Sequence, residues 1–370
     1  MRTVRLEGAG RVRVGKTLLG LLLGVSLVAI AVGCASDGDQ KPVAESGWES
    51  VGITWTPDAI AGITPGLIGW RSPNDGTPGR LVTVGTPVET VLWESPAPED
   101  AWVQLMSIRA DGRQMIGFLD DSRPGESDTG KTVLFREDGS VVVLPVPEGY
   151  EAIQSATFVD DGVLAVAYHA AKEEFDTTIG LVSPEGRWQE VTLAGELPDY
   201  QFVDRVAVLP ATGTVGIVLK LPGGTGDRDD SALVLASLDD GMLTAFTPAL
   251  FDDALPGIEP LQDGEGVTYV RTWNIVDDEW KPILVTAEWD GSAWRERVLT
   301  EPGDLVVAIE GGRMVAHSPS GDYWVRMSSH AEFEGESTLM RLADGAEELE
   351  PMGIDVTGVD WFEWVAPVGK

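Results

Sequence analysis

Cysteine is nearly absent from this chain of 370 residues, which contains only Cys34. A single cysteine excludes an intrachain disulfide and a zinc site built on cysteine ligands. Histidine is also scarce, and His169, His317 and His330 are the only three. We expect ordinary histidines on or near strands, because a metal or catalytic role requires partners that converge from distant parts of the chain. The sequence therefore identifies no catalytic residue and no cofactor-binding residue.

Basic residues are few: 26 Lys and Arg stand against 60 Asp and Glu, a formal net charge of −34. Residues 1–33 contain five of the basic residues and one acid, which leaves 21 basic and 59 acidic residues for the remainder. Such an acidic surface repels phosphate groups, so we expect no nucleic-acid partner and no attraction to anionic lipid head groups.

One uncharged and mostly apolar run, Thr17–Gly33, follows a segment that carries five basic residues. A basic start, an apolar core and small residues before a cleavage point predict a secretory signal peptide over residues 1–33. The run has 17 residues, whereas a membrane-spanning helix needs about 20. An uncleaved anchor is the alternative.

The run ends in Ala31-Val32-Gly33-Cys34, which resembles the lipobox of bacterial lipoproteins, with Ala31 where the motif usually has Leu. The resemblance implies that Cys34 carries the lipid, palmitate included, and becomes the mature N-terminus. Residues 34–46 are small and polar, which predicts a flexible tether. We therefore expect a protein anchored in the cell membrane, on the outer face of the cytoplasmic membrane.

Helical periodicity is missing, and alternation of apolar and polar residues takes its place. The pattern is clearest in Met106–Leu144, where Asp111-Gly112 and Asp138-Gly139 each separate two alternating segments. An Asp-Gly pair in this setting predicts a β-hairpin with a type I′ turn. Two successive hairpins predict one four-stranded sheet, which needs neighbouring sheets to cover its faces.

This pair of hairpins recurs along the chain. The first turns are placed at Pro65-Gly66, Asp111-Gly112, Asp161-Gly162, Thr212-Gly213, Asp263-Gly264 and Ser320-Gly321. The second turns are placed at Gly85, Asp138-Gly139, Glu185-Gly186, Asp240-Gly241, Asp290-Gly291 and Asp344-Gly345. The glycines of the second series are 54, 47, 55, 50 and 54 residues apart. A period of about 50 residues with four strands per repeat predicts an all-β fold, a β-propeller of six four-stranded blades over residues 47–370.

Two strand-like segments remain outside these repeats, Trp48–Trp55 and Val359–Ala366. A ring has no exposed edges when strands from both termini share one sheet. We therefore predict six blades with a closure that involves both termini. A seventh blade, completed from both ends, is the alternative.

The segment Arg109–Phe118 fits the turn-and-strand form of one propeller family. Together with the hairpin rhythm of residues 48–370, it makes the chain similar to bacterial propeller lipoproteins and, more loosely, to the TolB type of periplasmic propeller. The resemblance implies the fold and transfers no function.

Two loop motifs have simpler interpretations. Gly125–Thr132 matches the phosphate-loop pattern, but a strand follows it where a nucleotide site requires a helix, so we expect an inter-strand loop. Acidic residues crowd two other loops and could bind Ca²⁺, the one cofactor that the sequence suggests. The spaced calcium-binding pattern is missing, and solvated loop tips are expected. These residues are Asp227, Asp229, Asp230, Asp277 and Asp278.

Tryptophan is frequent, with 13 residues. Four lie in one repeat and two near the end: Trp273, Trp280, Trp289, Trp294, Trp361 and Trp364. We expect most of them to pack between blades. A sugar- or peptide-binding surface is the alternative, and residues 257–300 are its first candidate.

Neither the repeat nor the N-terminus names a ligand. We favour a binding or scaffold module that presents loops to a protein, peptide or glycan of the cell envelope. The longest loops, Asp120–Lys131 and Leu221–Ser231, are polar and acidic. The alternative is an extracytoplasmic metal-assisted hydrolase or lyase with its site in the central funnel. The lack of a G-x-S-x-G motif weighs against an enzyme, whereas paired carboxylates alone can perform glycoside hydrolysis.

Overall fold

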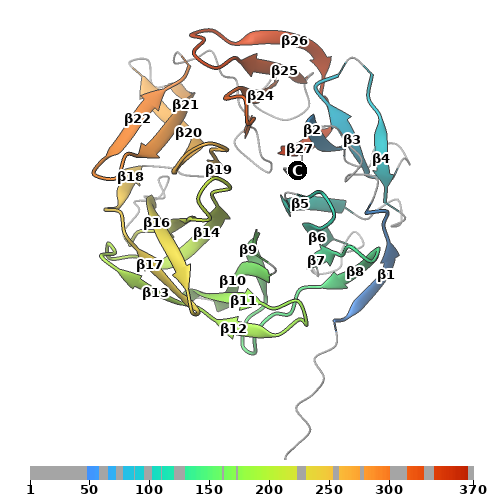
Figure 1. The fold of residues 1–370 in the computed structure, drawn as a ribbon, viewed down its shortest axis with the longest axis vertical. Coiled ribbons are helices and arrows are strands. Elements are labelled where there is room, and N and C mark those ends of the chain that lie inside the picture. The colour runs from blue at the N-terminus through green and yellow to red at the C-terminus, as the bar shows by residue number, and fades with distance from the viewer. Residues whose placement is uncertain are drawn as a thin grey trace, which may run out of the picture. The chain divides into compact units, whose positions relative to one another are not determined.

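The fold is a β-propeller of six blades around a central axis, and each blade is built on four strands that lie side by side from the axis to the rim (Figure 1). The computed structural model describes residues 48–57, 66–71, 78–86, 88–95, 102–109, 111–120, 130–160, 162–171, 174–222, 231–252, 258–275, 279–300, 315–328 and 337–365. The predicted fold class and blade number are confirmed, so the seven-blade alternative is wrong. Within these residues, no helix has the length and apolarity to cross a bilayer.

The strands of the first three blades follow one another from the axis outward. Blade one contains β27 (Val359–Val365), β2 (Gly66–Arg71), β3 (Arg80–Val84) and β4 (Val91–Glu94). Blade two contains β5 (Trp102–Ile108), β6 (Met115–Asp120), β7 (Lys131–Phe135), β8 (Ser140–Val143) and a fifth strand, β1 (Ser50–Thr54). Blade three contains β9 (Ala152–Val159), β10 (Gly162–Ala171), β11 (Glu174–Val182) and β12 (Trp188–Glu190).

The other three blades continue around the axis. Blade four contains β14 (Phe202–Val208), β15 (Val215–Lys220), β16 (Ser231–Asp239), β17 (Met242–Ala245) and β13 (Thr192–Gly195), and β18 (Leu250–Asp252) also pairs with β16. Blade five contains β19 (Ile258–Pro260), β20 (Gly266–Ile275), β21 (Glu279–Trp289) and β22 (Trp294–Val298). Blade six contains β23 (Val315–His317), β24 (Tyr323–Ser328), β25 (Ser337–Leu342) and β26 (Glu350–Asp355).

The ring closes in blade one, as the sequence predicts. Its innermost strand, β27, comes from the C-terminal end and pairs with β2, with Gly66 opposite Val365. The innermost strands then contact one another in the order β27, β5, β9, β14, β19, β23 and back to β27. Arginines from two blades fix the start of β27: Arg326 donates to the carbonyl of Val359, and Arg71 to that of Thr357.

The N-terminal segment Trp48–Trp55 does not join the closing sheet. Its strand β1 lies antiparallel to β8 at the outer edge of blade two. This placement corrects the expectation that both leftover segments would share one sheet. The turn predicted at Pro65-Gly66 lies partly outside the described residues, and the inner neighbour of β2 is β27, from the other end of the chain.

The turns contain the predicted glycines, although their type differs from place to place. At Asp138-Gly139 only the glycine is left-handed, with φ of 83°, and the Gly139 amide donates to the Arg136 carbonyl. That turn is therefore not type I′. Asp138 accepts from the Ser140 amide at 3.0 Å, which explains why Asp suits this position. At Asp240-Gly241 both φ angles are positive, 46° and 77°, and the predicted type I′ turn is present.

Apolar side chains fill the spaces between neighbouring blades. One cluster joins blades three and four through residues such as Leu164, Val206 and Leu219. Another joins blades one and two, where Trp55, Trp70 and Trp93 pack around Phe135, so these tryptophans fill inter-blade gaps. Successive side chains of a strand point to opposite faces of the blade. Each blade therefore needs a neighbouring blade on both sides to bury its apolar residues.

Candidate functional site

The outer edge of blades four and five carries Trp289 and Trp294, two of the tryptophans that the sequence marks as a candidate surface. Trp289 and Trp294 face each other across β21 and β22, with ring centroids 5.8 Å apart. The Trp294 indole N–H donates to the Pro248 carbonyl of blade four at 2.8 Å. The pair therefore belongs to two blades at once and is held in a fixed orientation. For Trp273, Trp280 and Trp361, the side chains lie outside the described residues.

Large apolar side chains are exposed along the outer edge of the same two blades. Phe246 and Phe251 at the edge of blade four are 44% and 61% exposed, and Val298 on β22 is 51% exposed. Leu250 and Trp294 pack against the same apolar cluster, which places β18 next to β22 (Figure 1). Phe246, Trp294 and Val298 lie on the side that faces blade five or blade four across their common gap, whereas Phe251, opposite Ala232, lies on the other side of the blade-four edge. We call these four residues, on both sides of that edge, the rim surface.

The strand pattern of blade four leaves part of this edge uncovered. β13 pairs in parallel with β17, from Thr192 opposite Met242 to Gly195 opposite Ala245, and so covers β17 on its outer side. β17 and β18 pair with successive parts of the same side of β16, and Phe251 of β18 lies opposite Ala232. Among the described residues, β13 ends at Gly195 and does not reach β18.

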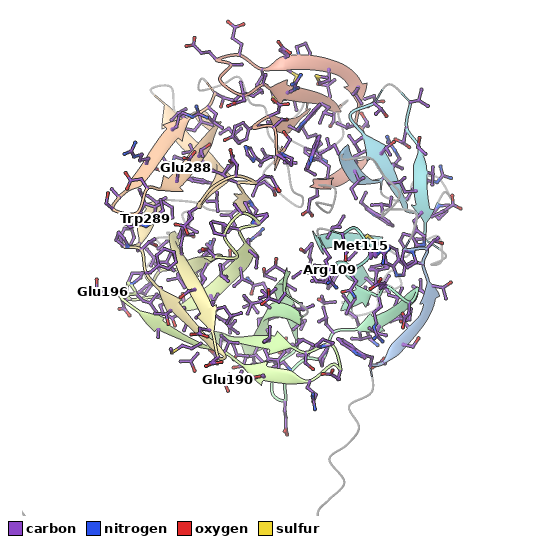
Figure 2. The ribbon with its side chains drawn as sticks, in the orientation of Figure 1. Arg109, Met115, Glu190, Glu196, Glu288 and Trp289 are labelled. Carbon is purple, nitrogen blue, oxygen red and sulfur yellow. The ribbon has the colours of Figure 1, made fainter. Side chains whose placement is uncertain are left out.

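The charged side chains of Asp290 and Arg295, next to the two tryptophans, form hydrogen bonds within one turn. Asp290 accepts from the amides of Ser292 and Ala293 at 2.9 and 2.8 Å and from Arg295 Nε at 2.7 Å. These hydrogen bonds, led by the Ser292 hydroxyl, hold the pKa of Asp290 well below its usual value. Figure 2 labels Glu288 and Trp289 just before this turn. The turn is pre-organised, because its acceptors and donors are already paired.

Titratable side chains also lie on the innermost strands, which the sequence alone did not single out. Gln154 of β9 donates to Asp204 of β14 at 2.7 Å, and Arg205 lies 3.5 Å from that carboxylate. Glu259 on β19 is 3% exposed, and Glu363 lies on β27. The propeller topology thus places acidic residues on the innermost strands of three blades. Arg109, after β5, is labelled close to the centre of the ring in Figure 2.

The predicted histidines are separated by the fold. Nδ1 of His169 lies 3.5 Å from Glu151 in blade three, whereas His317 is buried in blade six. His330 lies outside the described residues. Within the part of the chain that the structure describes, no group of three or more His, Cys, Asp or Glu side chains is arranged to hold a metal ion.

Several other predicted features lie outside the described residues: the signal peptide, Cys34, the tether, residues 121–129 and 223–230 of the two long loops, and the five loop aspartates. The end of the phosphate-loop motif is described. Lys131 and Thr132 lie in strand β7, where a nucleotide site requires a helix, in agreement with the inter-strand loop that the sequence predicts.

Comparison with known proteins gives no family. No family model matches the chain, and no curated protein matches it. Among solved structures, a Bacteroides uniformis protein named provisionally as a 6-phosphogluconolactonase is 12% identical, with a TM-score of 0.47 over 81% of this chain and 98% of its own. A thermostable family-43 glycoside hydrolase is 9% identical, with a TM-score of 0.39 over 69% of this chain and 94% of its own. The acylaminoacyl peptidase of Pyrococcus horikoshii is 12% identical, with a TM-score of 0.39 over 82% of this chain and 47% of its own.

Proposed function

We propose that this protein is a lipid-anchored, extracytoplasmic propeller that binds a macromolecule of the cell envelope, a protein, peptide or glycan, through its outer edge. The rim surface carries the proposal. Soluble proteins rarely expose large apolar patches unless these form a binding surface, and this one edge exposes Phe246, Phe251 and Val298. Rigid aromatic residues are also the side chains that most often dominate binding energy.

The electrostatics support a partner other than a second copy. The chain has a net charge of −34, so two copies repel each other over their whole surfaces. Near the rim surface, Arg295 is paired with Asp290 and Arg271 with Glu296, which keeps the local charge close to balance. A neutral or weakly basic partner therefore meets apolar contacts there without a large electrostatic cost.

The test is capture of envelope components by the full-length chain and by a Phe246→Ser/Phe251→Ser variant. Loss of two aromatic anchors worth about 2 kcal/mol each should weaken binding of the identified, purified partner by roughly several hundred-fold. The matched control is Val88→Ser/Val91→Ser, which removes two apolar side chains that are 74% and 47% exposed on blade one. The proposal fails if both variants bind the partner as the unaltered protein does.

The same assay tests the location that the sequence favours. Shortening loops 120–131 and 221–231 should leave the affinity unchanged if the rim surface is the interface. A partner lost only on shortening the loops would place the interface on those loops instead of on the rim.

The lipid anchor is tested separately. Cys34→Ala should move the protein from the membrane fraction to the soluble fraction or block its processing, because the lipid attaches to that sulfur. Unchanged fractionation and electrophoretic mobility would overturn the anchor, and with it the link to the lipoprotein group of propellers. Binding through the rim surface does not depend on this outcome.

The second candidate function is hydrolysis or elimination on an envelope substrate at the axis. The observation in its favour is that Asp204, Glu259 and Glu363 lie on the innermost strands of three different blades. Carboxylates are the groups that glycoside chemistry uses. Turnover of an envelope polysaccharide that is lost in Asp204→Asn and retained in the Phe246→Ser/Phe251→Ser variant would favour this function over binding at the rim.

A further inference from the structure

The space between blades five and six contains an apolar cluster, and beside that cluster it also buries several polar side chains. Three successive strands of blade five place Glu259, Thr268 and Thr286 directly opposite one another, and these side chains are 3%, 0% and 1% exposed. From blade six, the hydroxyl of Tyr323 lies 3.3 Å from that of Thr286. A buried polar contact of this kind is worth little unless its partners stay paired.

His317 forms a hydrogen bond across the same joint. It is the last residue of β23 and is 2% exposed. Its Nδ1 accepts from the backbone N–H of Gln262, which follows β19 in blade five, at 3.0 Å. The imidazole also packs on Tyr323, with ring centroids 4.6 Å apart.

This hydrogen bond fixes the protonation state of the ring. Nδ1 can accept only while it carries no proton, so the neutral form has its hydrogen on Nε2. If Nδ1 took up a second proton, its N–H would face the N–H of Gln262, and neither of these two buried donors would have an acceptor. The Gln262 amide would then lose its acceptor, and a buried amide without a partner is costly.

We propose that His317 is a proton-operated latch between blades five and six, closed when the imidazole is neutral and released when it is protonated. The latch joins the ring at a place away from the rim surface, and the proposal does not rest on the proposed function. It gives the ring one joint that loosens first on acidification.

The surrounding charges set the pH at which release occurs. Burial, the largest influence, lowers the pKa of His317 below its ordinary 6.5, and the carboxylates of Asp263, Asp322 and Asp344 oppose it. Glu259 faces the joint from β19, and the Tyr323 ring lies against the imidazole. Asp322 is already paired with Arg341.

The direction of the effect follows from linkage. Because folding lowers the pKa, the neutral imidazole contributes its full stability above pH 6.5. Between pH 6.5 and the lower pKa of the folded state, His317 binds a proton in the opened joint but not in the closed joint. The free energy that favours the closed joint therefore decreases as the pH falls through this range. Below the folded-state value the loss is complete.

The experiment is hydrogen exchange of the full-length chain between pH 7.5 and 5, corrected for intrinsic exchange rates. Protection of residues 258–270 and 315–325 should fall by up to about tenfold per pH unit below 6.5, the limit for one proton. His317→Asn places an amide oxygen near Nδ1 and cannot titrate, so protection should then be independent of pH. His317→Phe removes the acceptor, so the two segments should exchange fast at every pH.

His169→Asn is the control, because it removes a histidine from blade three and should leave the pH profile of the joint unchanged. A profile that persists in His317→Asn would overturn the latch. If a variant does not fold, the unaltered protein still decides the matter: NMR titration should show the Gln262 amide losing protection as the His317 ring takes up its proton. A Gln262 amide that stays protected through that titration would also overturn the proposal.

Discussion

At the scale of single residues, the Asp and the Gly of each turn have separate structural roles. The glycine supplies a left-handed backbone, and the preceding Asp accepts hydrogen bonds from the amides that the turn leaves free. Asp111, Asp138 and Asp290 all accept from the amide two residues further on. The recurring Asp-Gly pair is thus explained by local geometry and implies no binding role.

Two glycines in equivalent turns allow a test of this account. Gly139 has φ of 83°, and a Cβ there would lie 3.1 Å from the Trp55 carbonyl, whereas Gly345 has φ of 72° and open space. Gly345→Ala should lower the free energy of unfolding by about 1–2 kcal/mol through backbone strain alone. Gly139→Ala should cost roughly 1 kcal/mol more, because β1 must also move. Urea denaturation of both variants measures the difference, and equal costs would contradict it.

Asp322 provides a pH-dependent test. Burial by itself would raise the pKa of Asp322, but hydrogen bonds from Arg341, the Asp344 amide and Ser320 lower it below 3.8. A lowered pKa means that the ion pair stabilises the fold above pH 3.8 and that this contribution disappears as the pH falls further. Asp322→Asn should cost about 2–3 kcal/mol at pH 7.

The cost of Asp322→Asn should shrink towards pH 3, as followed by denaturation at pH 7, 5 and 3. Asp138→Asn is the comparison: its carboxylate is 59% exposed and its pKa is lowered mainly by hydrogen bonds from Ser140, so its cost should be smaller and should also decrease as the pH falls. A cost for Asp322→Asn that does not change with pH would show that the ion pair is not its origin.

At the scale of single elements, β1 is a strand that ties three blades together. At one end, the Trp48 indole donates to the Pro184 carbonyl of blade three at 3.1 Å. At the other end, Trp55 donates from Nε1 to the Arg136 carbonyl at 2.6 Å and packs against Phe135, 6.0 Å between centroids. Trp55 also belongs to the cluster that joins blades one and two.

Trp55→Ala should therefore release β1 and leave the ring folded. The loss of a buried Trp costs about 3–5 kcal/mol, and limited proteolysis should then cleave within residues 48–56 before any other part of the propeller. Trp48→Ala is the matched variant, with an expected cost of about 1 kcal/mol, since its side chain is only partly buried. Uniform cleavage across all blades in Trp55→Ala would show that β1 is not a separable element.

At the scale of the whole molecule, the ring depends on its last strand. β27 supplies the innermost strand of blade one and contacts both β5 and β23. Phe362 and Val359 are 0% and 1% exposed. Without β27, β2 would present an unpaired edge at the axis, and blade one would lose its innermost contacts with blades two and six.

Deletion of residues 359–370 should accordingly destabilise every blade. The expected loss exceeds the about 3–5 kcal/mol of a single buried aromatic side chain, because a whole strand with its hydrogen bonds is removed. Thermal unfolding followed by far-UV circular dichroism should lose its single transition. Deletion of residues 366–370 alone, beyond β27, should leave the melting temperature unchanged, and equal behaviour of the two truncations would contradict the closure.

The sequence by itself determined the strand class, most turn positions and the repeat that favours six blades, whereas the structure excluded the seventh. The alternation of apolar and polar residues indicates which side chains of a strand share a face. The regular spacing of Asp-Gly pairs indicates how many times the four-stranded unit recurs. Both are local properties that hold whatever the rest of the chain does. The composite closure also followed, because a leftover strand at the C-terminal end needs a partner.

Only the tertiary structure decided which faces meet. The contact of His317 with Gln262 joins residues 55 apart, and that of Trp294 with Pro248 joins residues 46 apart. Alternation gives two candidate neighbours for each face and does not distinguish an inter-blade gap from the rim. Phe251, Asp204 and His317 carry the same local signal as any strand residue, and their surroundings arise only when six sheets close around one axis.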